Sequence, residues 1–469
     1  MIETELEQDG KMVRANLFNL ERAPGAAFLP EYIEQIQKLQ VQVTFQCNES
    51  VRVKIVDAEK QRFEVPVPIT PPLDKASWLD KDGNPAQLYE VETSQSPFWI
   101  KIIRRDDRQV VFDTSAGPIL YYNQFLQLTT YRPTEYIYGF GETEHLNFKY
   151  DTNWSQQGMW ARDNGVGPGS NLYGVQPYHI SMEKSGKASG VLFLNSNAQE
   201  IAVSPHPHIT YRTIGGVLDF FVFMGPTVED VTKEYTQYLG RSPMFPYWSL
   251  GFQLCRYGYN SLDEVKRVVD ENRAAGIPYD VQYGDIDYME RQLDFTVELG
   301  DNFDGLMDYV HKIRTEYNMR YIPILDPAIS IDDKGEGAWK DPITGEDYPT
   351  HTRAMDANVY IRGEDGELET GKVWPYKPGI YLDDIVQDDN GWDENVGKYH
   401  SRVAFPDFFK NETYDWWLVE MERFRHGMLP ESAGEVRGLE YDGIWIDMNE
   451  PASFTAGRPG ADGYTQEAL

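Results

Sequence analysis

The hydrophobic pattern of this 469-residue chain changes its period near Thr227. From about residue 38 to 225, short runs alternate apolar with polar side chains, and clusters of Gly, Pro, Asn and Asp separate the runs. Alternation with a period of two is typical of strands that bury one face, and many such runs in succession favour an antiparallel sandwich. We therefore expect residues 1–226 to form an amino-terminal β-sandwich domain.

Beyond Thr227 the pattern becomes helical and then alternates. Thr227 and Asp230 have the spacing of a capping box, which predicts a helix to Leu239 inside a linker segment over residues 227–245. Residues 246–469 then alternate strand-like and helical segments, as in parallel β/α domains. The expected strands are 247–255, 279–285, 321–326 and 441–447.

Helix signals separate these strands. Ser261 and Glu264 cap a helix that Gly276 ends, Leu306 and Ile313 lie at helical spacing in a second helix, and a third is expected over residues 413–426. A long polar excursion at about residues 331–402 interrupts the alternation before the last helix.

Acidic residues follow three of the expected strands. Asp285, Asp326 and Asp447 each end one, and Tyr257 follows the first. In a (β/α)8 barrel the carboxyl ends of the strands converge on one face, where polar residues are usually catalytic. Four β/α units are half of such a barrel, so we expect an incomplete barrel in this chain. The alternative is a complete four-stranded doubly wound domain, which the absence of a Gly-rich phosphate loop disfavours.

Charge and composition exclude several function classes. The chain has 75 acidic and 43 basic side chains and a net charge of -32, which would repel nucleic acid and anionic lipid. No run approaches the roughly 18 apolar residues of a membrane span. Cys47 and Cys255 are too far apart in sequence for a disulfide framework or a CxxC metal pair. A neutral substrate such as a sugar is compatible with this charge.

One motif is specific. The segment GIWIDMNEP, residues 443–451, resembles the nucleophile signature of family 31 glycoside hydrolases, and similar segments extend along the chain: RFEVPVPI, YGFGETEH, GVLDFFVFMGPT, YDVQYGDIDYMERQLDFT, LDPAIS, GKVWP and VAFPDFF. The likeness is greatest to the carboxyl-terminal catalytic halves of the family's intestinal maltases. It implies a β-sandwich followed by a (β/α)8 barrel, with an insert after the third strand at about residues 331–402.

The resemblance also implies roles for individual residues. Asp447 would be the catalytic nucleophile, Asp285 would bind hydroxyls of the terminal sugar, and Asp163 would reach the sugar from a sandwich loop. The residues that would line the pocket are Tyr257, Ile286, Ile324, Trp374, Trp445, Met448 and Phe454. The family's acid/base aspartate, an arginine and a histidine lie on later strands and have no match here. No cofactor and no metal are implied.

The implied chemistry is retaining glycoside hydrolysis. It needs two carboxyl groups about 5 to 5.5 Å apart, one ionised to attack the anomeric carbon and one protonated to release the leaving alcohol. Asp447 suits the first role, because carboxylates act as nucleophiles in glycosidases. Alone, Asp447 could equally be a helix cap, Asp163 a turn residue and Asp285 a buried strand end. Asp285 and Asp287 could also be read as a D-x-D metal pair of a sugar-nucleotide transferase, which the net acidity disfavours.

We therefore expect hydrolysis of terminal α-linked glucose from malto-oligosaccharides or related α-glucosides. The expected partners are the α-glucoside and the missing half of the barrel, and the resemblance implies an extracellular or membrane-surface luminal location. A transglucosylase of the same fold would share all these motifs. The alternative from another class is a catalytically inactive sugar-binding or partner-stabilising fragment. Because a general acid contributes about 10² to 10⁴-fold, the chain alone should show little turnover.

Overall fold

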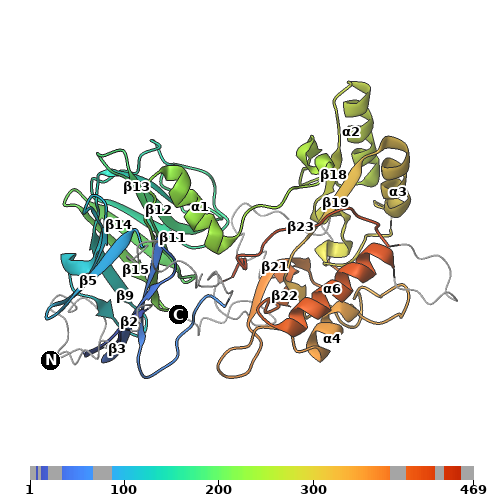
Figure 1. Cartoon of the computed structure of the whole chain (residues 1–469). Coiled ribbons are helices and arrows are strands. Elements are labelled where there is room, and N and C mark those ends of the chain that lie inside the picture. The colour runs from blue at the N-terminus through green and yellow to red at the C-terminus, as the bar shows by residue number, and fades with distance from the viewer. Residues whose placement is uncertain are drawn as a thin grey trace. The chain divides into compact units, whose positions relative to one another are not determined.

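The computed structural model describes residues 7–8, 12–18, 34–66, 87–300, 302–380, 398–427 and 438–455. The chain divides into two compact units, Met1–Ser242 and Pro243–Leu469 (Figure 1). Each unit has its own sheets and its own hydrophobic core.

The first unit contains two sheets, each of eight strands among the described residues, and every strand pair in them is antiparallel. The first sheet has the order β1-β2-β3-β4-β16-β13-β12-β10. Its strands are β1 (Glu7–Gln8), β2 (Met12–Phe18), β3 (Lys38–Phe45), β4 (Ser50–Asp57), β10 (Tyr136–Gly141), β12 (Gln176–Met182), β13 (Ala188–Phe193) and β16 (Leu218–Phe223).

The second sheet has the order β11-β14-β15-β9-β7-β6-β5, with β8 paired to β9. Its strands are β5 (Tyr89–Gln95), β6 (Phe98–Arg104), β7 (Val110–Asp113), β8 (Leu120–Tyr121), β9 (Leu126–Tyr131), β11 (Ser155–Met159), β14 (Gln199–Ser204) and β15 (His208–Thr213).

Alternating side chains of the two sheets form a shared core. Val51, Val53 and Ile55 of β4 are fully buried, whereas Arg52 and Lys54 between them are partly exposed. The same hydrophobic cluster contains Ile100 and Ile102 of β6, from the other sheet. The two sheets therefore pack face to face, which is the sandwich arrangement that period-two alternation favours.

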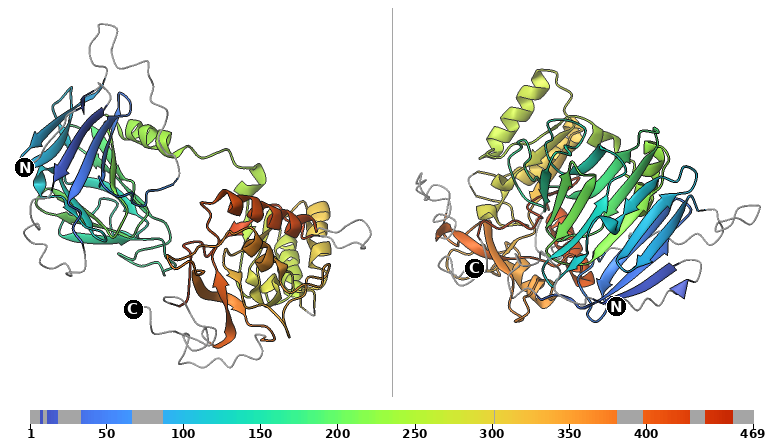
Figure 2. Two further views of the ribbon diagram at one scale, coloured as in Figure 1. Left: turned by 90° about the horizontal axis from the view of Figure 1, so that it is seen from below. Right: turned by 90° about the vertical axis from the view of Figure 1, so that its left-hand side faces the viewer.

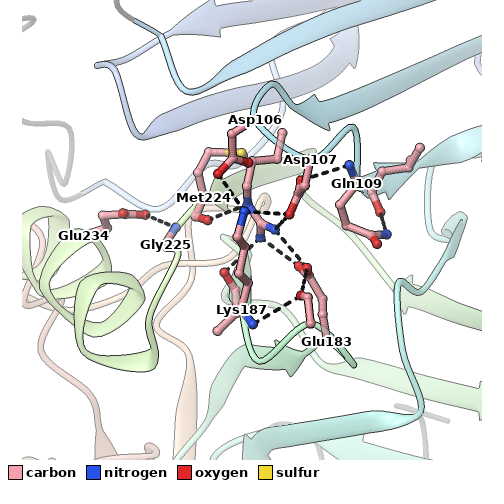
Figure 3. Close-up of polar contacts among 12 residues, drawn as sticks. Asp106, Asp107, Gln109, Glu183, Lys187, Met224, Gly225 and Glu234 are labelled. Atoms are coloured by element: carbon pink, nitrogen blue, oxygen red, sulfur yellow. Dashed lines mark hydrogen bonds and ion pairs between the residues drawn. The ribbon is translucent and has the colours of Figure 1, made fainter.

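A buried arginine joins distant parts of the first unit. The Arg104 guanidinium donates to both carboxylate oxygens of Glu183, at 2.8 and 2.7 Å, and both side chains are 3% exposed. It also donates to the backbone oxygens of Ala188 and Met224. Lys187 bonds Asp106 and Asp107 at the edge of this network (Figure 3). Because donors and acceptors are matched, a buried charge is tolerated here.

Helix α1 (Val228–Leu239) follows the last sandwich strand and packs on β12, β13 and β16. The Thr227 hydroxyl accepts the backbone N–H of Asp230, so the predicted cap forms. The helix ends at Leu239, and η3 (Tyr247–Leu250) is the next helical turn. The helix therefore occupies only the first part of the expected linker segment.

The second unit contains a four-stranded sheet among the described residues, with the order β17-β18-β19-β23 and all pairs parallel. Helices lie between its strands in the sequence (Figure 2). The elements are β17 (Gln253–Leu254), α2 (Leu262–Ala274), β18 (Val281–Gly284), α3 (Leu306–Tyr317), β19 (Arg320–Leu325), α6 (Asn411–His426) and β23 (Trp445–Ile446). The Ser261 hydroxyl caps α2 through the backbone N–H of Glu264, as the spacing predicts.

Two expected strands are much shorter than predicted. Over residues 247–255 only β17 is extended, because the first part forms η3 between Pro246 and Gly251. Over residues 441–447 only β23 pairs with a neighbour. The Asp442 carboxylate there accepts the backbone N–H of Tyr321 at 3.1 Å, so a side chain takes the place of a backbone partner.

The polar excursion at 331–402 has secondary structure of its own. It contains α4 (Pro349–Asp356) and β21 (Thr370–Tyr376), and β22 (His400–Ala404) closes it. Strand β22 lies between β21 and β20 (Ile329–Ser330) in an antiparallel sheet. The Arg291 guanidinium, 2% exposed, pairs with Asp333 at 2.9 Å and donates to the Tyr376 backbone oxygen. A buried ion pair thus fixes this segment to the loop after β18.

None of the helices within the described ranges combines the length and the apolar composition that a bilayer crossing requires.

Candidate active site

Three aspartates leave the parallel sheet at the same edge. The last residue pair between β18 and β19 is Gly284 with Pro323, and the last pair between β19 and β23 is Leu325 with Ile446. Asp285, Asp326 and Asp447 are the next residues of their strands. Since neighbouring strands are about 4.8 Å apart and parallel strands end at a common edge, these carboxyl groups form one cluster.

Asp447 follows the short strand β23. Its backbone N–H points to the Leu325 oxygen at 3.5 Å, and its side chain is half-buried. Met448 is 7% exposed and has a φ of 54°, in the left-handed region. A left-handed residue turns the chain sharply, so the strand ends at the aspartate. The preceding Ile446 is 66% exposed, on the open edge of the sheet.

Asp285 lies in a negative environment. Its Oδ1 accepts the backbone N–H of Ile286 at 2.8 Å. Burial raises the pKa of Asp285 to about 6, and the negative charges of Asp287 and Asp447 act in the same direction. Burial raises the pKa of Cys255 to about 11, and the negative charges of Asp285, Asp287 and Asp447 act in the same direction. These mutual effects show that the groups at the ends of β17, β18 and β23 share one electrostatic environment.

Asp287 does not lie beside Asp285 on a strand, as the D-x-D interpretation requires. Strand β18 ends at Gly284, and residues Ile286–Tyr288 form a turn of 3-10 helix. The Asp287 carboxylate instead accepts the backbone N–H of Gly258 at 2.9 Å, where it holds the loop after β17. Within the described ranges, no group of three His, Cys, Asp or Glu side chains is placed to hold a metal.

Aromatic side chains gather beside Asp447. The Trp374 ring of β21 lies 6.1 Å from the Tyr257 ring and packs edge-on against Phe454, with centroids 5.0 Å apart. The Phe454 backbone N–H donates at 2.8 Å to the backbone oxygen of Lys372, which lies on β21 with Trp374. Trp374 and Phe454 also pack against the hydrophobic cluster that contains the buried Met448. We call Tyr257, Trp374, Phe454 and Met448 the aromatic wall. Such a wall suits the CH-rich face of a sugar.

The other expected lining residues belong to the core of the second unit. Ile286 and Ile324 are each 2% exposed in its main hydrophobic cluster, and Trp445 packs against that cluster with its ring edge-on to Tyr283. These side chains support the strand ends from below.

Asp163 lies in the first unit, on the loop between β11 and β12. Its carboxylate is exposed and accepts the Tyr173 hydroxyl at 2.5 Å. It is therefore available to a ligand on the surface of the sandwich unit.

Sequence reasoning did not select two buried acids of this cluster as site residues. Asp326 follows β19 and is 3% exposed, and Asp294 is 2% exposed. The strand-end position of Asp326 was the available signal. Asp294 gives no such signal, because it reaches the cluster only through folding of the loop that follows β18.

Comparisons with known proteins agree with this geometry. Residues 242–468 match the model of the glycosyl hydrolases family 31 TIM-barrel domain. This part of the chain belongs to glycoside hydrolase family 31. Human intestinal sucrase-isomaltase is 43% identical over 425 residues, which are 90% of this chain and 22% of that protein. Mouse lysosomal alpha-glucosidase is 34% identical over 425 residues, which are 90% of this chain and 38% of that protein.

Among solved structures, a glucosidase II alpha subunit bound to DNJ shares the fold of this chain, with a TM-score of 0.71, 18% identity, and coverage of 98% of this chain and 52% of that one. The chain therefore spans between about a fifth and a half of the length of these three relatives. The resemblance to family 31 is confirmed, and so is its barrel domain.

Proposed function

We propose that this chain is part of a retaining α-glucosidase, in which Asp447 attacks the anomeric carbon of a terminal α-linked glucose. The supporting observation is the half-buried Asp447 at the edge of a parallel sheet, beside Asp285 and the aromatic wall. The substrate class comes from the relatives, which are named as sucrase-isomaltase and as alpha-glucosidase.

Each part of the cluster has a role in this proposal. Asp447 supplies an ionised carboxylate for attack, and the aromatic wall binds the sugar ring and excludes water. Asp285 accepts hydroxyl groups of the glucose, since ionised acceptors make the stronger hydrogen bonds. Ile286, Ile324 and Trp445 support the pocket from the core of the second unit. Asp163 is proposed as a sugar contact on the surface of the first unit.

The proposal also requires a second half of the barrel. The described sheet has four strands, and its two edge strands, β17 and β23, are open. Apolar side chains near these edges face solvent, with Leu250 64% and Ile446 66% exposed. Four further β/α units would cover these edges and provide the general acid. The relatives named as intestinal and lysosomal support an extracellular or luminal location.

The test joins this chain to the remainder of its protein and measures release of glucose from maltose. The Asp447→Asn variant keeps the shape of the side chain but removes its charge. We expect its kcat/KM to fall by about 10³-fold or more, because a covalent nucleophile has no substitute in this mechanism.

The matched control is Asp415→Asn, which removes the same charge from an exposed position on α6. It should leave kcat/KM unchanged. Unchanged activity of Asp447→Asn would remove the nucleophile assignment. Sugar binding without any turnover in the joined wild-type protein would instead favour the inactive sugar-binding alternative. The ratio of glucose to transfer products separates hydrolysis from transglucosylation.

A further inference from the structure

Two buried aspartates, Asp294 and Asp326, lie together at the strand end next to Asp447. The backbone N–H of Asp326 donates to the Oδ1 atom of Asp294 at 2.7 Å. The two side chains are 3% and 2% exposed. By strand register, Asp326 is also the lateral neighbour of Asp447, because the preceding residues Leu325 and Ile446 are paired. A second acid is thus built into the wall of the site.

The surroundings offer this pair no positive charge. The carboxyl groups that face Asp326 are Asp285 at the end of β18, and Asp447 and Glu450 after β23. Within the part of the chain that the structure describes, neither Asp294 nor Asp326 forms an ion pair with Lys, Arg or His, and Oδ1 of Asp326 has no hydrogen-bond partner.

Two buried tyrosines also pack against the pair, but neither hydroxyl neutralises it. The Tyr288 hydroxyl donates to the Ile324 backbone oxygen at 2.7 Å. The Tyr348 hydroxyl donates to the Asp294 backbone oxygen at 3.1 Å. Both phenols therefore use their protons on the backbone. The nearby arginine Arg291 is engaged with Asp333.

Elementary electrostatics decides the protonation state. An ionised carboxylate that is removed from water without a cation is so unfavourable that such groups take up a proton instead. Two carboxyl groups close together cannot both ionise cheaply, as in the carboxylate pairs of other enzymes. We infer that Asp294 and Asp326 form a buried carboxyl pair that keeps a proton at neutral pH, so that a neutral acid rather than another negative charge lies beside Asp447.

The direction of the pKa shifts agrees with this geometry. Burial raises the pKa of Asp294 well above its ordinary range, and the charge of Asp326 adds to the shift. Burial also raises the pKa of Asp326, with further contributions from Asp447, Asp285 and Glu450. The protonated pair itself does not depend on the proposed function. Its consequence, that Asp326 is a positioning residue for the nucleophile, rests on that function.

The effect on the nucleophile follows from charge. An ionised Asp326 would place a second negative charge next to the Asp447 carboxylate. A neutral Asp326 can instead donate a hydrogen bond within the cluster, which stabilises ionised neighbours. The pair would therefore leave the proposed nucleophile without a like charge on the neighbouring strand.

Stability against pH tests the pair in the 469-residue chain without any need for catalysis. A raised pKa means that stability is fully present below the unfolded pKa of about 3.9 and is lost as pH rises through the folded value. An Asn side chain has the shape of a neutral carboxyl group but does not titrate, so its contribution to stability does not depend on pH. We expect Asp326→Asn to raise the ratio of folded to unfolded protein at about pH 7.5, by roughly tenfold or more in urea unfolding, and expect the gain to disappear near about pH 3.5, below the unfolded pKa.

Two further variants make this comparison decisive. Asp294→Asn should show the same pH-dependent gain, and it replaces the first variant if that one does not fold. Asp415→Asn, at an exposed position, should show none. A gap between Asp326→Asn and wild type that is equal at both pH values would overturn the inference.

Infrared spectroscopy of the wild-type chain gives an independent result. A protonated carboxyl group has a C=O stretch distinct from that of a carboxylate, so a band that persists at neutral pH and weakens in Asp326→Asn or Asp294→Asn supports the pair. Absence of any protonated-carboxyl band in the wild type at neutral pH would overturn it.

Activity of the joined protein tests the positioning role. We expect the alkaline limb of the kcat/KM profile to flatten in Asp326→Asn, because the variant has no proton to lose, and expect Asp326→Leu to lower kcat more than it changes KM. An alkaline limb unchanged in Asp326→Asn would contradict the positioning role. A wild type without turnover would instead contradict the proposed function and leave the stability result intact.

Discussion

Buried acids are paired with arginine in the core of the sandwich but not at the strand ends of the barrel unit. In the sandwich, Arg104 is matched by Glu183, and the buried Asp219 is matched by Arg52 at 2.6 Å. At the strand ends of the barrel unit, Asp294 and Asp326 are buried with no cation beside them among the described residues. Matched charges maintain a structure, whereas unmatched ones oppose it and mark a place where chemistry has been favoured over stability.

The contrast also exists inside the barrel unit. Away from the strand ends, the Arg353 guanidinium pairs with Glu420, which is 1% exposed, and Arg291 pairs with Asp333. These buried acids are neutralised where they hold the insert, whereas the acids near Asp447 are left unmatched. The difference belongs to the site and not to the unit as a whole.

The largest expected effect comes from breaking a matched charge. Arg104→Met leaves Glu183 buried without its partner, and should lower the free energy of unfolding of the sandwich by about 3 to 5 kcal/mol. Urea unfolding followed by circular dichroism measures it. The control is Lys38→Met, which removes an exposed pair with Glu59 and should change stability by less than about 1 kcal/mol. Equal effects of the two variants would contradict the idea that matching holds this unit together.

Glu234 of α1 is an exception that could break the comparison. Burial raises its pKa to about 8, and its carboxylate accepts the Gly225 backbone N–H at a long 3.3 Å. Its contribution to stability is present below the unfolded pKa and is lost as pH rises toward 8. We expect Glu234→Gln to stabilise the chain by about 2 to 4 kcal/mol near neutral pH and by nothing at about pH 3.5, below the unfolded pKa.

Thermal and urea unfolding at both pH values measure this difference. A pH-independent change would show that the Gln side chain alters packing rather than charge. If the expected gain is found, a buried acid without a cation also occurs outside the site. The group of buried acids near Asp447, rather than any single one, would then distinguish the site.

The smallest expected effect concerns Asp285. Because its pKa is raised to about 6, the wild-type carboxylate opposes folding at neutral pH. Asp285→Asn keeps an acceptor for the Ile286 N–H and should stabilise the chain by about 1 to 2 kcal/mol at about pH 7.5, with no gain at about pH 4. Differential unfolding measures the gain. A loss of stability would mean that the ionised group makes a favourable contact that outweighs its burial.

Local signals in the sequence predicted much of this molecule. The caps at Thr227 and Ser261 formed, because a hydroxyl three residues before a free backbone N–H needs no distant partner. The buried run of β19 was also predicted from its apolar composition. Family 31 motifs located the strand-end aspartates.

Features set by distant residues were not predictable in the same way. Residues 441–447 read as a full strand, but the Asp442 side chain binds the backbone of Tyr321, which lies in another strand. Asp294 lies 32 positions before Asp326, and nothing in its neighbourhood indicates that the two meet. Side-chain partners across the fold, rather than local preferences, decide both cases.

The shortness of β23 has a consequence for when activity can arise. Two registered pairs with β19 hold this strand, and its other edge is open among the described residues. Asp447 thus follows a weakly supported strand of the sheet. A further strand paired at that edge would hold Asp447 more firmly in place. Under the proposed function, reactivity would then depend on pairing of that edge as well as on the residues that line the site.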